Sequence, residues 1–91
     1  MIKQGQILKA CNEITGTKII ENPNNPQHDS IEKVILFPQD LIFVDECNLL
    51  EDTEYNQFHY SIKATVGGVR DVYFVSDVAS NDFEVLQEIG E

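Results

Sequence analysis

The stretch FHYSIKATVGGVRDVYFVSD, residues 58–77, decides the fold class. Apolar and polar side chains alternate from residue 58 to 66, which is the period of a half-buried β-strand. Gly67 and Gly68 follow, and glycine tolerates the positive φ angles of a two-residue hairpin turn. The segment VRDVYFVSD then returns as a second strand. The stretch therefore predicts a β-hairpin whose core face carries Phe58, Tyr60, Ile62, Ala64 and Val66.

A two-residue turn also predicts the register of this hairpin. The expected cross-strand pairs are Val66 with Val69, Ala64 with Asp71, Ile62 with Tyr73, and Tyr60 with Val75. Most aromatic pairs fall on this face, so we expect it to face the core.

Working outward, the segments on either side of the hairpin also favour strands. LIFVDEC (residues 41–47) and FEVLQEI (83–89) are short apolar runs, and IEKVILFPQD (31–40) is β-branched until Pro38 interrupts it. The stretch ENPNNPQHDS (21–30) predicts a long loop, because its prolines and asparagines cannot continue a helix or a central strand. Residues 6–20 are ambiguous, since their apolar positions fit both a helical stripe and an imperfect alternation.

In this order the elements resemble the SH3-like small β-barrel, a likeness of element order without a residue motif. The first strand is then GQILKACNEI (5–14), residues 15–40 form a long first loop, and the later strands are residues 41–47, 58–66, 69–77 and 83–89. The resemblance implies a mainly β fold of about five strands. It does not extend to a groove for proline-rich ligands, because the chain has no Trp. The alternative is an α+β fold, with residues 4–15 helical against a four-stranded antiparallel sheet.

The composition is that of a single folded domain, residues 1–91. Hydrophobic residues make up 42% of the chain, enough for one modest core. No apolar run approaches the roughly 18 residues of a membrane span, and the first residues lack the pattern of a secretory signal. We therefore expect a cytoplasmic protein in which Cys11 and Cys47 are reduced thiols.

The net charge of −10 is carried entirely by residues 40–91. Residues 1–39 contain four lysines and four acids, whereas residues 40–91 contain twelve acids against Lys63 and Arg70. Such a surface repels nucleic acid and anionic membranes, because binding to phosphate depends on Lys and Arg. It attracts basic proteins and speeds encounter with them.

The stretch DECNLLEDTEY, residues 45–55, concentrates five of these acids. It lacks the glycine of a calcium loop and has two leucines where ligands are needed. A catalytic carboxylate pair needs a dry pocket, whereas acids on a loop leaving a strand face water. A solvated loop and a recognition surface both stay open. If the last strand lies near this stretch, its acids join the same face. The predicted partner-binding residues are then Asp45, Glu46, Glu51, Asp52, Glu54, Asp82, Glu84 and Glu88.

The sequence holds no convincing catalytic or metal-binding motif. The run HDS (28–30) favours a turn or cap over a triad, because consecutive residues point in different directions. Nothing local supports a thiol–imidazole pair of Cys47 with His59, or of Cys11 with His28. Zinc ligands would need closer spacing, so we expect no enzyme, no metal and no cofactor.

We therefore expect a small acidic protein that binds and does not catalyse. The concrete hypothesis is an inhibitor or modulator that engages a basic surface of a nucleic-acid-processing protein, with carboxylates mimicking phosphates. Such proteins resemble bacteriophage-encoded modulators of host machinery, which act in the host cytoplasm. The alternatives are a structural or adaptor subunit that associates through its sheet edge, a homodimer formed through the aromatic hairpin, and a small enzyme.

Overall fold

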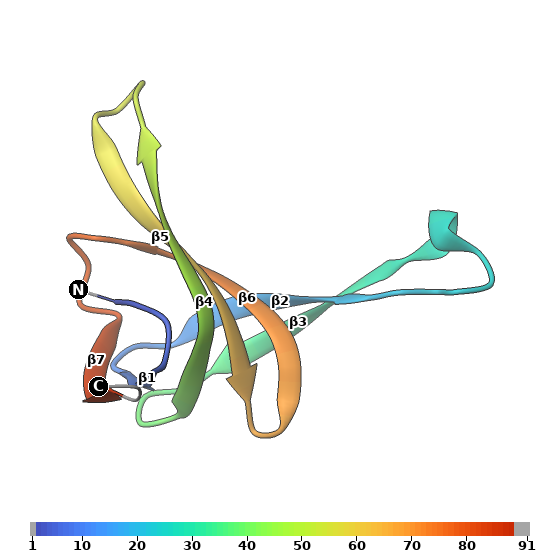
Figure 1. Ribbon diagram of the computed structural model, residues 1–91, viewed down its shortest axis with the longest axis horizontal. Coiled ribbons are helices and arrows are strands. Elements are labelled where there is room, and N and C mark those ends of the chain that lie inside the picture. Colours follow the sequence, from blue (N-terminus) through green and yellow to red (C-terminus); the bar gives the residue numbers. More distant parts are fainter. Residues whose placement is uncertain (1, 89–91) are drawn as a thin grey trace.

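The computed structural model describes residues 2–88, except for the side chains of Pro26, Gln87 and Glu88 (Figure 1). The prediction of a mainly β fold is confirmed, because these residues form no α-helix and only one short 3₁₀ helix, η1 (Pro26–His28). The strands are β1 (Gln6–Ala10), β2 (Ile14–Ile20), β3 (Ser30–Leu36), β4 (Leu41–Asp52), β5 (Gln57–Val66), β6 (Val69–Asp77) and β7 (Phe83–Glu88).

All seven strands belong to one antiparallel sheet, in the order β3-β2-β6-β5-β4-β1-β7. β3 and β7 are its two edges, and within residues 2–88 no ladder joins them. The sequence predicts about five strands. The two further strands are β2 and β3, which occupy half of the expected long first loop. The resemblance to an SH3-like barrel stays a prediction.

Residues 14–36 form a hairpin because both of its strands are rich in β-branched residues. Its ladder runs without a break from Ile14 opposite Leu36 to Ile20 opposite Ser30. The loop between the strands is closed by its own polar groups, since Asn22 N donates to Asp29 Oδ1 at 2.8 Å. The Asp29 carboxylate therefore closes the loop across seven residues, directly after η1.

The alternative with a helix over residues 4–15 is wrong. Residues 6–10 form β1, in which Gln6, Leu8 and Ala10 are buried and the residues between them are half-buried. β1 lies between β4 and β7, so both of its edges find backbone partners. Tertiary pairing therefore decides a segment whose local pattern fits either structure.

The β5–β6 hairpin forms around Gly67 and Gly68 as predicted, but its register differs. Val66 pairs with Val69, whereas Ala64 then pairs with Val72, Ile62 with Phe74 and Tyr60 with Ser76. A bulge between the first two pairs turns Val72 and Phe74 inward. Tyr73 and Val75, the expected core residues, are 40% and 68% exposed instead.

The buried apolar core draws on five of the seven strands of residues 2–88. Its largest fully buried side chain is Phe74, which meets Phe83 edge-on with ring centroids 6.2 Å apart. Gly16 lies under the Phe74 ring, where an added Cβ would come within 2.4 Å of it. The buried apolar residues are Leu8, Ala10, Leu36, Ile42, Val44, Tyr60, Ile62, Ala64, Val72 and Phe74.

Two hairpins extend away from this core as separate arms (Figure 1). The β2–β3 arm (residues 19–31) continues beyond the β2–β6 pairs, which are Thr17 with Tyr73 and Lys18 with Val72. The β4–β5 arm (residues 49–58) continues beyond His59, the last β5 residue that pairs with β6. Both arms expose large apolar side chains, so the fold presents surface that its own core does not cover.

Candidate protein-binding surface

The acidic stretch DECNLLEDTEY is mostly strand, which corrects the expectation of a loop. β4 continues to Asp52 because every residue from Glu46 onward pairs with β5. Asp45 is the one extra residue, at a bulge between Val44 and Glu46. Its carboxylate accepts a hydrogen bond from Thr65 Oγ1 at 2.6 Å, and Glu46 lies opposite Lys63. These two acids therefore belong to the body of the sheet.

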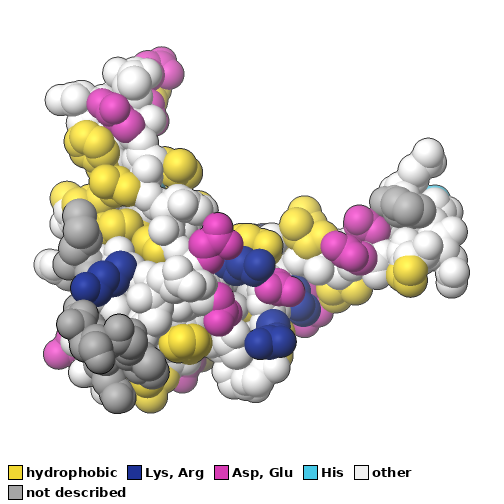
Figure 2. Space-filling view, viewed as in Figure 1, with side chains coloured by type: hydrophobic (Ala, Val, Ile, Leu, Met, Phe, Trp, Pro, Cys, Tyr) yellow, Lys and Arg dark blue, Asp and Glu magenta, His cyan; other side chains and the backbone are white. Residues whose placement is uncertain are grey.

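The other three predicted acids of this stretch lie together at the far end of the β4–β5 arm. Glu51 and Asp52 end β4, and Glu54 lies in the turn that follows. The turn is organised locally, since Glu54 N donates to Asp52 Oδ1 at 3.1 Å. Figure 2 shows acidic side chains at the tip of this arm and hydrophobic ones below them.

The acids of the last strand have structural partners. Asp82 Oδ2 accepts hydrogen bonds from Ser76 Oγ at 3.2 Å and Ser80 Oγ at 3.0 Å, and Asn12 Nδ2 donates to its other oxygen. Glu84 Oε2 lies 2.9 Å from Lys9 Nζ, and Glu84 raises the pKa of Lys9 by its hydrogen bond and by its charge. Glu88 lies opposite Gln6, and its side chain is outside the described part of the chain.

The two acidic groups do not merge into one face. β1 separates β4 from β7 in the sheet, and the β4–β5 arm carries its acids away from β7 (Figure 1). Among the predicted acids whose side chains the structure describes, Glu51, Asp52 and Glu54 lie at the same end of the β4–β5 hairpin.

The apolar part of this arm was not predicted from the sequence. Tyr55 is 66% exposed, and Leu49, Leu50 and Phe58 are about half exposed. The two leucines lie on opposite faces of β4, because neighbouring strand residues alternate. The Leu49-Leu50 pair within a run of acids could have indicated it. Such a pair is unfavourable in a solvated loop, and the acids beside it are unfavourable in a buried strand.

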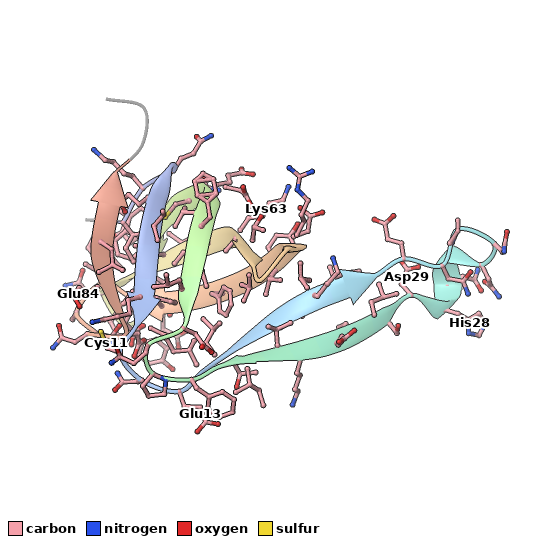
Figure 3. The ribbon with its side chains drawn as sticks, turned by 90° about the horizontal axis from the view of Figure 1, so that it is seen from below. Cys11, Glu13, His28, Asp29, Lys63 and Glu84 are labelled. Atoms are coloured by element: carbon pink, nitrogen blue, oxygen red, sulfur yellow. The ribbon has the colours of Figure 1, made fainter. Side chains whose placement is uncertain are left out.

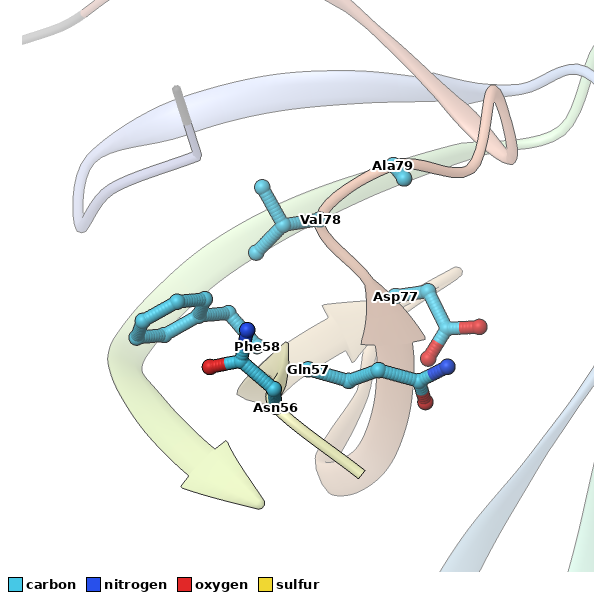
Figure 4. A pocket seen from close by; sticks show the side chains of 6 residues that line it. All are labelled: Asn56, Gln57, Phe58, Asp77, Val78 and Ala79. Atoms are coloured by element: carbon cyan, nitrogen blue, oxygen red, sulfur yellow. The ribbon is translucent and has the colours of Figure 1, made fainter. Parts of the chain in front are cut away.

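A hollow lies beside the arm, between the start of β5 and the turn after β6 (Figure 4). Its volume is about 270 Å³. The Phe58 ring and the Val78 side chain lie toward one end, and the polar ends of Gln57 and Asp77 toward the other (Figure 4). Val78 N donates to Phe58 O at 3.0 Å, which fixes the turn against the arm. The lining residues are Asn56, Gln57, Phe58, Asp77, Val78 and Ala79.

A second, smaller hollow of about 160 Å³ shares Asp77 and Val78 with the first. Its lining mixes hydroxyl groups with apolar side chains. The two hollows form one recessed strip, and no Lys or Arg lines either of them. The residues of the second hollow are Ile2, Tyr60, Ser76, Asp77, Val78, Ser80, Phe83 and Val85.

The cysteines and histidines do not form the pairs considered from the sequence. Cys47 lies opposite Ile62 on the core side, whereas His59 lies opposite Leu50 on the other face, beside Asp77 Oδ1. Burial raises the pKa of the Cys47 thiol, which donates to Ile2 O at 3.6 Å. Cys11 and His28 lie far apart, at the sheet and at the end of the β2–β3 arm (Figure 3).

Within residues 2–88, no group of three or more His, Cys, Asp and Glu side chains could hold a metal ion. The described residues also contain no helix long and apolar enough to cross a membrane. No known family model, curated protein or solved structure matches this chain.

Proposed function

We propose that this chain is a small, non-enzymatic binding protein that engages a basic surface of a larger protein through the β4–β5 arm. The observation that carries the proposal is the composition of this arm: exposed large apolar side chains beside Glu51, Asp52 and Glu54, with no Lys or Arg between Lys33 and Lys63. Solubility alone favours the acids but not the exposed leucines and aromatics. A partner surface that is both apolar and basic would complement the exposed apolar side chains and the carboxylates of the arm.

The partner class that this chemistry favours is a nucleic-acid-processing protein. Such proteins carry Lys and Arg where they contact phosphates, and carboxylates can occupy those positions instead. The protein would then act as an inhibitor or modulator of the phage-encoded type, in the host cytoplasm. The segregated charge of −10 supports this proposal, because it also speeds the encounter with a basic surface.

The test is affinity capture from a candidate host lysate at low and high salt. The wild type is compared with a variant carrying Glu51→Gln, Asp52→Asn and Glu54→Gln. A matched control carries Glu13→Gln, Glu21→Gln and Glu32→Gln, which remove the same charge from the other half of the chain. We expect the wild type and the control to capture one basic protein that high salt releases, and the arm variant to lose it. Capture of the same protein by the arm variant would contradict the proposal.

A second candidate function is a structural or adaptor subunit that adds the edge of its sheet to a larger assembly. The observation that favours it is the unpaired outer edge of β3, where Ile31 and Ile35 are 70% and 47% exposed. Backbone pairing does not weaken with salt as charge pairing does. Association that persists at high salt and is lost on Ile31→Lys with Ile35→Lys would favour this function.

A further inference from the structure

We propose that the first hollow anchors one apolar side chain of a basic partner segment, and that a Lys or Arg beside this anchor lies over Asp77. The inference rests on the proposed function, because it names the partner chemistry that the β4–β5 arm would recognise. It adds a defined apolar contact to the charge of the arm, since Glu51 and Asp52 lie opposite Phe58 and Gln57.

The size and lining of the first hollow fit a single side chain. Its volume of about 270 Å³ lies below the roughly 300–1,000 Å³ of small-molecule sites. Phe58 and Val78 are 44% and 43% exposed, so an apolar group of the Leu, Met or Phe type would remove their surface from water. The backbone hydrogen bond from Val78 to Phe58 holds these two walls in place before any partner arrives.

The charges around the hollow determine which segment it would take. Asp77 lines both hollows, and its side chain is 60% exposed beside His59. The arm above adds Glu51, Asp52 and Glu54. A Lys or Arg next to the anchor therefore meets carboxylates and no competing cation from the lining residues.

A second copy of this chain fits the hollow less well. Each copy has a charge of −10, and the acids are concentrated in the half of the chain that forms the hollow. Two copies would bring like charges together at this surface. The occupant we infer is therefore a basic segment of another protein, with one apolar anchor.

The experiment uses the full-length chain and a short fluorescent peptide with a single Leu flanked by lysines. Two matched peptides replace the Leu by Ser or the lysines by Gln. Binding is measured by fluorescence anisotropy, and the contact is located by amide chemical shifts in nuclear magnetic resonance. The variants are Phe58→Ser, which removes a wall of the hollow, and Asp77→Asn. Phe37→Ser is the control, because Phe37 is an exposed aromatic residue between β3 and β4 that lines neither hollow.

We expect the Leu peptide to shift the amides of residues 56–58 and 77–79. The Ser peptide and the Phe58→Ser variant should each bind at least about tenfold more weakly. Asp77→Asn should weaken binding about threefold at low salt and less at high salt. Phe37→Ser should bind as the wild type does. Retained amide shift dispersion would show that each variant is folded.

The anchor proposal would be overturned by equal binding of the Leu and Ser peptides, by shifts that leave out residues 56–58 and 77–79, or by no binding. Self-association through residues 56–58 and 77–79, detected by sedimentation without peptide, would assign the hollow to a second copy and also overturn it. In each of these cases the proposed function is judged separately, by the capture experiment with the arm variant. If the capture experiment fails and the Leu peptide still binds at residues 56–58 and 77–79, only the proposed function is contradicted.

Discussion

Ala64 of β5 lies opposite Val72 of β6, and two residues nearer the turn Val66 lies opposite Val69. Between these pairs β6 therefore has two residues, Arg70 and Asp71, where β5 has only Thr65. Asp71 absorbs the extra length with a left-handed backbone, at φ 60°. This bulge places Val72 and Phe74 in the core, so the packing of the sheet depends on one exposed residue near a turn.

Replacing Asp71 by a β-branched residue should destabilise the fold. Asp71→Val puts a branched side chain at positive φ, which costs about 1–2 kcal/mol in L-residues. Asp71→Asn tolerates the same backbone and serves as the control, since it also removes the charge facing Lys63. Urea unfolding, monitored by circular dichroism, should show that Asp71→Val is less stable than both Asp71→Asn and the wild type. Equal stability of the Val and Asn variants would show that the bulge relaxes without cost.

Gly16→Ala should also lower the free energy of unfolding, through overpacking. The new methyl would lie 2.4 Å from a carbon of the Phe74 ring, which is buried and has little room to move. Inserting a methyl into a filled core costs about 1–3 kcal/mol. Thr15→Ala, on the exposed face of the same strand, is the control in the same urea experiment. A stable Gly16→Ala variant would mean that Phe74 shifts freely.

The fold class was predictable from the β5–β6 alternation and its glycine turn, because both are local signals. The register was not, because a bulge leaves no mark in the alternation of residues 58–66. The strand character of residues 31–36 was predictable, but their pairing with residues 14–20 across the expected loop of residues 21–30 was not. The part of β4 beyond Cys47 was not predicted, because its acids favour a loop. Pairing with β5 overrides that unfavourable local composition. The acids Glu51, Asp52 and Glu54 were predictable as a group, whereas the hollow depends on Phe58 and Val78, which only the tertiary fold brings together.

Because of the ion pair between Lys9 and Glu84, the free energy of unfolding should fall at alkaline pH. The hydrogen bond and the charge of Glu84 raise the pKa of Lys9 above its ordinary 10.5, because they favour the charged form in the fold. The contribution is therefore complete below pH 10.5 and is lost as pH rises through the folded pKa. Titration of the lysine side chains by nuclear magnetic resonance should show a lower Lys9 pKa in Glu84→Gln. The Lys63 pKa, raised by Asp71, should stay unchanged.

Neutralising the tip of the β4–β5 arm should stabilise the protein slightly. Glu51, Asp52 and Glu54 lie close together, and the structure gives them no ion pair within residues 2–88. The variant Glu51→Gln, Asp52→Asn and Glu54→Gln should gain roughly 0.5 kcal/mol in unfolding free energy by relief of like-charge repulsion. Urea unfolding at about 0.01 M and about 1 M salt tests whether repulsion is the cause, since the Debye length falls from roughly 30 to 3 Å and the repulsion is then screened. A gain that disappears at high salt would mean that the acids oppose stability and are retained for binding; a loss of stability at either salt would assign them a structural role in the turn.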